Sequence, residues 1–401
     1  MYLTHVNKNA LYVSLFWGVL FIGFLPNTYA SRLEGAAEAR VTGEQYLDVS
    51  LVPMYQNALR EGRDTGNYTF DVIGKFTLVD REGTFGNTDL ILWFNTSDKL
   101  GSGDSAPELA SKSGLLWDTN DISADSSNST PLVLGLDQWF FEDRVSLGFG
   151  KYFPGQGFLL SPYTADNSNS FTSKMISGNP VVSWWEAIGI GMLGGYWGDE
   201  WFVQAGFVDS KAEDDLDFGS FEDGEFAYLL ETSYEPERES GQTSIGVVLY
   251  YIDSTESKDS ESGIVGQFTH EWGENEAYAA FGRYSWRDDG ESRKPNDPSP
   301  EPAVDHGGFI GAAWNEPFGS RKQQLAAALV YGEPAGYKDD QGFNNQFGTE
   351  IFWAFRPNHW FTIIPNVQFM RNIDDDIETV VGLRIGLGFE RNWPESSIIG
   401  P

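Results

Sequence analysis

Polar side chains recur at every second position in several segments of the sequence, between apolar and aromatic side chains. Gln346 and Glu350 alternate with Phe347 and Ile351, and further along the chain Arg384 lies between two apolar residues. Carboxylates accept hydrogen bonds, guanidinium groups donate them and amides do both, so such a face can bind the hydroxyl groups of a polar solute. This chemistry requires an element that places alternate residues on one face.

Residues that could catalyse a reaction or bind a metal are scarce. The sequence has no cysteine, and its four histidines are His5, His270, His306 and His359. It contains no HExxH zinc pattern, no GxSxG nucleophile pattern and no phosphate-binding loop. We therefore expect no enzyme activity, no catalytic residue, no metal site and no cofactor.

The alternation has a period of two, which is typical of β-strands and places the two kinds of side chain on opposite faces. The alternating segments run for about 10 to 14 residues, whereas strands of globular proteins are mostly about 5–6 residues long and membrane strands about 9–11. The sixteen expected strands are 46–58, 67–80, 87–97, 132–141, 143–153, 183–197, 200–210, 224–234, 242–252, 261–272, 276–287, 304–316, 321–332, 344–356, 359–372 and 378–390.

The connections between these segments alternate between short and long. Those after even-numbered strands are short, such as 198–199 and 357–358. The long ones all follow odd-numbered strands: 98–131, 154–182, 211–223, 288–303 and 333–343. This parity is typical of bacterial outer-membrane barrels, which have short periplasmic turns and long external loops. The sequence therefore predicts an all-β fold, a transmembrane antiparallel β-barrel of sixteen strands, which closes because lipid offers an edge strand no partner.

The first 30 residues have the features of a secretory signal peptide. Lys8 precedes an apolar stretch over 10–25, and Thr28 and Ala30 supply small residues before a cleavage site. We therefore expect export to the bacterial outer membrane. The predicted organisation is a signal peptide at 1–30, an N-terminal periplasmic segment at 31–45, the barrel at 46–390 and a C-terminal tail at 391–401.

The composition excludes several classes of protein. Aromatic residues make up 15% of the 401 residues, which is too many for a disordered chain. The 26 Lys and Arg residues against 59 Asp and Glu residues give a net charge of −33, which would repel nucleic acid. Mean hydropathy is −0.34, and no apolar run after the signal peptide is long enough for a transmembrane helix.

Aromatic residues gather near the ends of the predicted strands, as expected for the two aromatic belts of a barrel at the membrane surfaces. Examples are Trp139, Tyr152, Trp201, Trp272 and Trp360. Acidic runs such as 213–217 and 374–376 fall between strands and suit a solvated surface. A second interpretation is that divalent cations bridge them to anionic lipopolysaccharide, so we expect membrane lipid and lipopolysaccharide as partners.

Five short sequence motifs, three of them close to the end of the chain, resemble those of a known protein family. They are QFGTEIFW at 346–353, FTIIPNVQF at 361–369 and VVGLRIGLGF at 380–389, preceded by DQWFF at 137–141 and LGFGKYF at 147–153. Over 130–390 the chain resembles the carbohydrate-selective porin family, the OprB-like outer-membrane porins. The resemblance implies a sixteen-stranded channel through which sugars diffuse passively, with inward arginine and glutamate side chains at its constriction.

Strand parity predicts the side chains that line the solute path. Charged and amide groups there can replace the hydration of a sugar, and an aromatic ring such as Trp93 can stack on its apolar face. The predicted pore-lining residues are Asp71, Lys75, Trp93, Asn95, Gln204, Glu231, Gln267, Arg283, Glu350, Asn366, Gln368 and Arg384.

The expected partners are small hydrophilic solutes, carbohydrates first among them, and a homotrimeric assembly stays open. Three alternatives stay open as well. The barrel could be a general porin, a channel for acidic or aromatic solutes, or an outer-membrane hydrolase in which a histidine lies beside an exposed serine.

Two long loops are candidates for narrowing the channel, since a sixteen-stranded barrel otherwise leaves a wide aqueous opening. Loop 98–131 is the longest and contains the apolar run Leu115–Trp117. Loop 154–182 follows the fifth strand. We expect one of the two to fold into the barrel.

Overall fold

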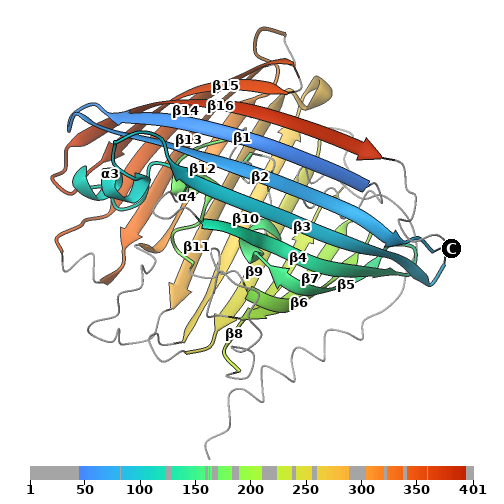
Figure 1. Cartoon of the computed structure of the whole chain (residues 1–401). Helices are drawn as coiled ribbons and strands as arrows, with labels where there is room; N and C mark the ends of the chain where they lie inside the picture. Colours follow the sequence, from blue (N-terminus) through green and yellow to red (C-terminus); the bar gives the residue numbers. More distant parts are fainter. Residues whose placement is uncertain are drawn as a thin grey trace, which may run out of the picture.

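The computed structural model describes residues 45–393, with the exception of 82, 123–127, 159–160, 162, 165–169, 183–188, 210–223, 237–240, 255–259, 289–303, 320–322, 337–340 and 359. Within these ranges the chain forms a closed barrel of sixteen strands (Figure 1). The strands are β1 (Gln45–Ala58), β2 (Arg63–Val79), β3 (Phe85–Lys99), β4 (Asn128–Phe140), β5 (Val145–Tyr152), β6 (Gly189–Trp197), β7 (Trp201–Asp209), β8 (Phe226–Tyr234), β9 (Thr243–Ile252), β10 (Glu261–Trp272), β11 (Tyr278–Asp288), β12 (Val304–Trp314), β13 (Gln323–Pro334), β14 (Gln346–Asn358), β15 (Phe361–Arg371) and β16 (Ile377–Trp393).

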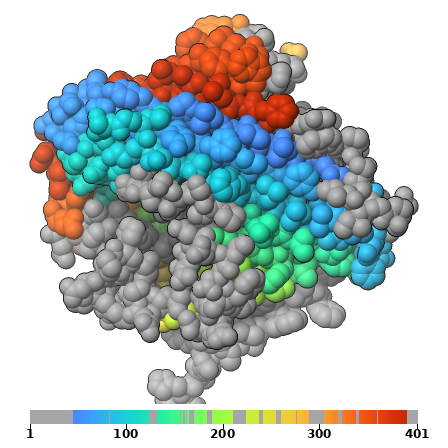
Figure 2. Space-filling model, in the orientation of Figure 1, coloured from blue at the N-terminus to red at the C-terminus, as the bar shows by residue number. Residues whose placement is uncertain are grey.

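Every strand pairs antiparallel with its neighbours along the chain, and β1 pairs with β16 to close the barrel. We call the β1–β16 pair the seam, because it joins the two ends of the barrel. Its register runs from Gln45 opposite Trp393 to Ala58 opposite Val380. In Figures 1 and 2 the N-terminal strands, in blue, lie directly against the C-terminal strand, in red.

All sixteen predicted strands are present, which confirms the predicted all-β antiparallel barrel. The connections keep the predicted parity. Short turns such as 141–144 and 198–200 lie at one end, which we call the short-turn end. The strand ends that the long connections 100–127, 153–188 and 210–225 join lie at the other, which we call the long-loop end.

The bounds of the barrel differ slightly from those predicted. Strand β16 continues to Trp393, so Arg391–Trp393, predicted as the start of the tail, pair with Gln45–Leu47. The pairing continues there because β1 would otherwise present unpaired backbone groups. The predicted signal peptide, the segment up to residue 44 and the tail from residue 394 lie outside the described residues.

Side chains alternate between an apolar outer face and an inner face of mixed character. On β14, Phe347, Ile351 and Trp353 are exposed on the outer face, whereas Glu350 and Phe352 are buried on the inner face. A contiguous exposed apolar surface is rare in water-soluble monomers and suits contact with hydrocarbon.

Exposed aromatic rings form a chain at the short-turn end. Trp272 stacks on Tyr278 with centroids 6.0 Å apart, Tyr278 on Trp314 at 6.4 Å, and Trp314 contacts Phe318 at 5.6 Å. This row has the position of a membrane-interface belt.

Two aromatic residues assigned to the belts from the sequence are not part of them, and that assignment was wrong. Trp139 is buried on the inner face and packs against Trp197 at 5.1 Å. The hydroxyl of Tyr152, also buried, donates to Asp137 at 2.9 Å. Both rings therefore contribute to the filled interior of the barrel.

Two connections leave the long-loop end and fold into the barrel. The β3–β4 loop (100–127) carries α3 (Ala106–Lys112), and the β5–β6 loop (153–188) carries the 3-10 turn η1 (Pro154–Gln156) and α4 (Lys174–Ser177). Their buried apolar residues form one cluster with inner-face residues of strands all around the wall. The loop members are Ala110, Leu115, Leu116, Trp117, Phe158, Tyr163, Phe171, Met175, Ile176, Val181 and Val182. The sequence predicted that one loop enters, whereas both do.

Helix α3 is the longer of these two inserted helices, and its start is defined by a capping box. The Ser105 side chain accepts a hydrogen bond from the backbone N–H of Glu108, and the Glu108 carboxylate accepts one from the backbone N–H of Ser105. Within the described part of the chain, no helix combines the length and the apolar character needed to cross a bilayer.

Candidate functional site

All twelve predicted pore-lining residues occupy inward positions of their strands. Residues paired across adjacent antiparallel strands share a face of the sheet. The register pairs eight of them directly: Asp71 with Asn95, Gln204 with Glu231, Gln267 with Arg283, and Glu350 with Gln368. The other four have the same parity on β2, β3, β15 and β16.

Burial divides this set into two groups. The buried group is Lys75, Gln204, Glu231, Arg283, Glu350, Asn366, Gln368 and Arg384. The half-buried group is Asp71, Trp93, Asn95 and Gln267. Because the buried side chains contact the inserted loops or other wall residues, they act as anchors, whereas the half-buried group retains accessible surface.

The Glu350 carboxylate is the central anchor of the β5–β6 loop. It accepts hydrogen bonds from the backbone N–H groups of Thr172 and Ser173 at 2.9 and 2.8 Å, and from the Thr172 hydroxyl at 2.9 Å. Asn366 donates to the same carboxylate at 3.0 Å and to the Thr172 hydroxyl at 2.7 Å. A buried carboxylate with this many donors fixes the loop at one position.

The β3–β4 loop is anchored beside it through Thr119. The backbone carbonyl of Thr119 accepts from Gln56 at 3.0 Å and from Gln368 at 2.7 Å, and its hydroxyl donates to Gln56 at 2.9 Å. Gln368 also donates to the Thr172 hydroxyl at 2.7 Å. One wall amide therefore binds both loops.

Two buried arginines bind backbone carbonyl groups of the β5–β6 loop. Arg384 donates to the carbonyl of Ser170, and Arg283 donates to that of Gly178 at 2.6 Å. Arg283 also donates to the side chain of Gln267 at 3.0 Å. These guanidinium groups, which the family resemblance implied for the constriction, position the loop.

Two further buried groups complete the anchors. Gln204 donates to the Glu231 carboxylate at 2.6 Å and to the backbone carbonyl of Gly157 in the β5–β6 loop at 2.5 Å. Lys75 forms an ion pair with Asp89 at 3.3 Å on the wall itself. Both charges of that pair are fully buried, so the pair presents little net charge to the interior.

The half-buried group on β2 and β3 is a compact polar and aromatic cluster. The Asp71 carboxylate accepts hydrogen bonds from the Trp93 indole N–H and from the Asn95 amide, each at 2.7 Å. Asn95 also donates to the Thr69 hydroxyl at 2.8 Å, and the Trp93 ring contacts Phe153 at 5.8 Å. This cluster combines a carboxylate, an amide and an indole, which are the groups that bind hydroxyls and stack on a sugar ring.

The prediction missed several residues that hold the loops, among them Gln56, Asn67, Thr119 and Thr172. A signal existed for the first two, because Gln56 shares the parity of the inward Met54, and Asn67 that of Asp71. Both lie at predicted strand ends, where parity is easily overlooked. Nothing in the sequence marks Thr119 or Thr172, since loop residues have no periodicity that indicates what they contact.

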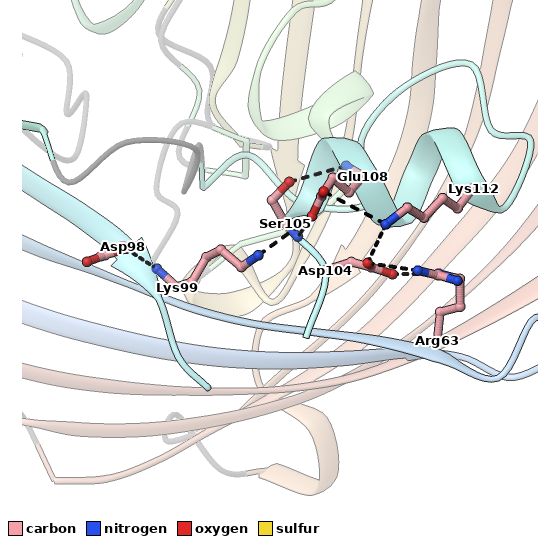
Figure 3. Close-up of polar contacts among 7 residues, drawn as sticks. All are labelled: Arg63, Asp98, Lys99, Asp104, Ser105, Glu108 and Lys112. Atoms are coloured by element: carbon pink, nitrogen blue, oxygen red, sulfur yellow. Dashed lines mark hydrogen bonds and ion pairs between the residues drawn. The ribbon is translucent and has the colours of Figure 1, made fainter. Parts of the chain in front are cut away.

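A network of charges fixes α3 at the long-loop end of β2 (Figure 3). Arg63 donates to both oxygens of Asp104, at 2.5 and 2.9 Å, and Lys112 forms an ion pair with Asp104 at 2.7 Å. The Arg63 guanidinium, and after it the Lys112 ammonium, hold the pKa of the Asp104 carboxyl well below its usual range. Lys99 lies 3.6 Å from Glu108, whose pKa is lowered mainly by the backbone N–H of Ser105.

Among the residues that the structure describes, no group of three or more His, Asp and Glu side chains could hold a metal ion. Two histidines have described contacts, and neither belongs to such a group. His270 bonds the Thr243 hydroxyl at 2.9 Å, and His306 lies 2.9 Å from Glu333.

Comparison with solved structures identifies the fold. The Pseudomonas putida OprB structure at high pH superimposes with a TM-score of 0.70 at 12% identity, over 90% of this chain and 100% of that chain. The low-pH structure of the same protein gives a TM-score of 0.56 at 12% identity, with the same coverage. No family model matches the sequence, and no curated protein is significantly similar to it. The chain therefore has the barrel fold of OprB, which confirms the fold that the sequence resemblance implied.

Proposed function

We propose that this protein is an outer-membrane channel through which small hydrophilic solutes, carbohydrates first among them, diffuse passively. The closed barrel has an exposed apolar outer face, which supports a membrane location. Its inner face carries the half-buried polar cluster of β2 and β3, which supports a hydrated path. The likeness to the OprB fold and the sequence resemblance to the OprB-like porins point to the same class of protein.

The single observation that carries the carbohydrate part of the proposal is the half-buried cluster of Asp71, Trp93 and Asn95. Its carboxylate and amide are held 2.7 Å apart, so they are ordered before a solute arrives. Preordered groups bind a polyhydroxylated ring at a lower entropic cost. The indole beside them supplies an apolar surface for the C–H face of the sugar.

The proposal is tested by recording single-channel currents of the purified protein in planar bilayers while a panel of sugars is added. We expect sugars to block the current reversibly. Trp93→Ala should weaken the block by about 5- to 30-fold, corresponding to the loss of about 1–2 kcal/mol of stacking. Trp353→Ala, which removes an indole from the outer face, is the matched control and should leave the block unchanged.

The outcomes separate the alternatives. An open channel that no sugar blocks would contradict carbohydrate selectivity and favour a general porin. A folded protein that carries no current at all would overturn the channel function itself.

The proposed orientation places the short-turn end in the periplasm and the long-loop end outside the cell. An epitope tag in the β7–β8 connection (210–225) should be detected on intact cells, whereas a tag in the β14–β15 turn (359–360) should require permeabilised cells. The reverse labelling would contradict the orientation. Protease digestion serves as the control for both tagged proteins, because a tag that unfolds the barrel makes the whole chain sensitive to protease.

A further inference from the structure

The seam is the place where the barrel is closed without a connection along the chain. We propose that the two inserted loops form a clasp across the seam, so that the segments that narrow the barrel also keep it closed. This inference does not depend on the solute that passes through the channel.

The middle of the clasp is a bridge from β1 to β15 that passes over β16. Thr119 of the β3–β4 loop accepts from Gln56 on β1 and from Gln368 on β15 through the same carbonyl oxygen, at 3.0 and 2.7 Å. Thr172 of the β5–β6 loop binds Gln368 at 2.7 Å and lies 3.5 Å from the Gln56 amide. Both loops therefore connect strands on the two sides of the seam.

A glycine of β16 makes room for this bridge. Gly382 is paired with Gln56 across the seam and with Asn366 on β15. A Cβ atom at Gly382 would lie 2.1 Å from the Asn366 side-chain oxygen and 3.1 Å from the Gln56 Cγ. A larger residue would therefore displace Asn366, which donates to the Thr172 hydroxyl, and press on Gln56, which carries the bridge on β1.

Helix α3 covers the seam at the long-loop end. The side chain of Leu109 is fully buried in a small cluster with Ala58 of β1 and Val380 of β16, which are paired directly across the seam. The Arg63–Asp104 ion pair ties the helix to β2 on one side of the seam (Figure 3). The helix thus packs on both strands at once.

Contacts outside the helix extend the clasp at the rim. The backbone N–H of Arg60, in the β1–β2 turn, donates to Glu378 of β16 at 3.0 Å, and the Arg60 guanidinium pairs with Asp376. The two loops are also joined to each other, because the backbone N–H of Lys174 donates to the carbonyl of Asp118 at 3.2 Å. The clasp is therefore one connected network.

The test compares Gly382→Ala with Gly388→Ala. Both glycines lie on inward positions of β16, but a Cβ atom at Gly388 meets nothing within 4 Å. We expect Gly382→Ala to accelerate unfolding in guanidinium chloride by about tenfold, because it weakens the buried hydrogen bonds of Asn366 and Gln56 to the loops. Gly388→Ala should unfold at the rate of the unaltered protein, measured by tryptophan fluorescence in lipid vesicles. Equal rates for the two variants would overturn the clasp.

A disulfide across the seam separates opening of the seam from local strain at Gly382. Leu51 and Leu387 are paired across the seam, and the chain contains no cysteine that could compete with an engineered pair. In the oxidised Leu51→Cys/Leu387→Cys background, Gly382→Ala should no longer accelerate unfolding. An undiminished effect in that background would locate the damage at Asn366 alone and overturn the proposal.

Gln368→Met provides a second variant if Gly382→Ala does not fold. It removes the donor to Thr119 and Thr172 without adding volume at the seam. The same acceleration of unfolding, again suppressed by the disulfide, is expected. No acceleration would contradict a clasp through the loops.

Discussion

The two halves of the inner wall hold the inserted loops in different ways. Strands β7 to β13 bury mainly apolar side chains against the loops, with Gln204 and Arg283 as polar exceptions, whereas strands β14 to β16 and β1 to β4 bury mainly polar side chains. The apolar residues are Val208, Leu229, Val248, Val265, Phe281, Phe309 and Val330. The polar residues that bind the loops are Glu350, Asn366, Gln368, Arg384, Gln56 and Asn67.

The difference assigns separate physical roles to the two halves. Apolar burial is non-directional and scales with the area removed from water, so the β7–β13 half supplies attachment. Hydrogen bonds are directional and weaken steeply when their geometry is poor, so the polar half, together with Gln204 and Arg283, sets the exact position of the loops. The half-buried cluster of Asp71, Trp93 and Asn95 lies on the polar half, and we expect the solute path there.

The largest expected effect comes from the apolar half. Phe281 stacks on Tyr163 with centroids 4.9 Å apart and contacts Phe171 at 5.8 Å. Phe281→Ala should lower the free energy of unfolding by about 3–5 kcal/mol, since it removes a buried ring and leaves a cavity. Denaturant titration in lipid vesicles measures this. Phe268→Ala, which removes an outer-face ring on the adjacent strand, should lower the free energy of unfolding clearly less. Equal losses for the two variants would contradict the proposal that the inner apolar residues attach the loops.

A smaller effect on stability but a larger one on current is expected at Glu350. Glu350→Ala removes the acceptor for the backbone N–H groups of Thr172 and Ser173, which leaves buried donors unpaired at a cost of about 2–3 kcal/mol. Because the loop loses its position, single-channel currents should become larger or noisier. Glu350→Gln retains an acceptor oxygen and should restore most of the unaltered current. Quiet, unchanged currents in Glu350→Ala would show that the polar half does not set the loop position.

Tyr163→Phe sharpens the comparison within the apolar half. The Tyr163 hydroxyl donates to Glu271 and accepts from Asn315 at 2.8 Å, close to the short-turn end. The substitution keeps the stacking on Phe281 and removes these bonds, so the expected loss is about 1 kcal/mol in the same titration. A loss as large as that of Phe281→Ala would mean that polar contacts attach the loop on this side as well.

The smallest effect is expected at Asp104, whose ionic partners are partly exposed and screened by solvent. Because its pKa is lowered in the folded protein, the carboxylate stabilises the packing of α3 above its usual pKa, and this contribution is lost only as the pH falls below that range. Asp104→Asn should increase thiol labelling of Leu109→Cys at neutral pH. The ratio of labelling rates with and without Asp104→Asn should approach one at strongly acidic pH. A ratio of one at neutral pH would contradict the role of Asp104.

The sequence alone determined the fold, the face of each strand and the two ends of the barrel. Period-two alternation at Phe347 to Ile351 is a local property, because neighbouring side chains of a strand necessarily point to opposite faces. This is why all twelve predicted residues lie on inward positions. The two ends of the barrel followed from a second observation, the strict alternation of short and long segments between the predicted strands.

Only the tertiary structure decided which inward residues meet solvent and which are anchors. Glu350 and Thr172 are separated by 178 positions, and no local pattern indicates that a loop hydroxyl and a wall carboxylate will meet. Trp139 and Tyr152 were misassigned for a related reason, since aromatic residues near strand ends suit both a belt and a filled interior. Burial inside a barrel depends on the segments that fill it, and here two loops fill it through contacts such as Gln368 with Thr119, which lie 249 positions apart in the sequence.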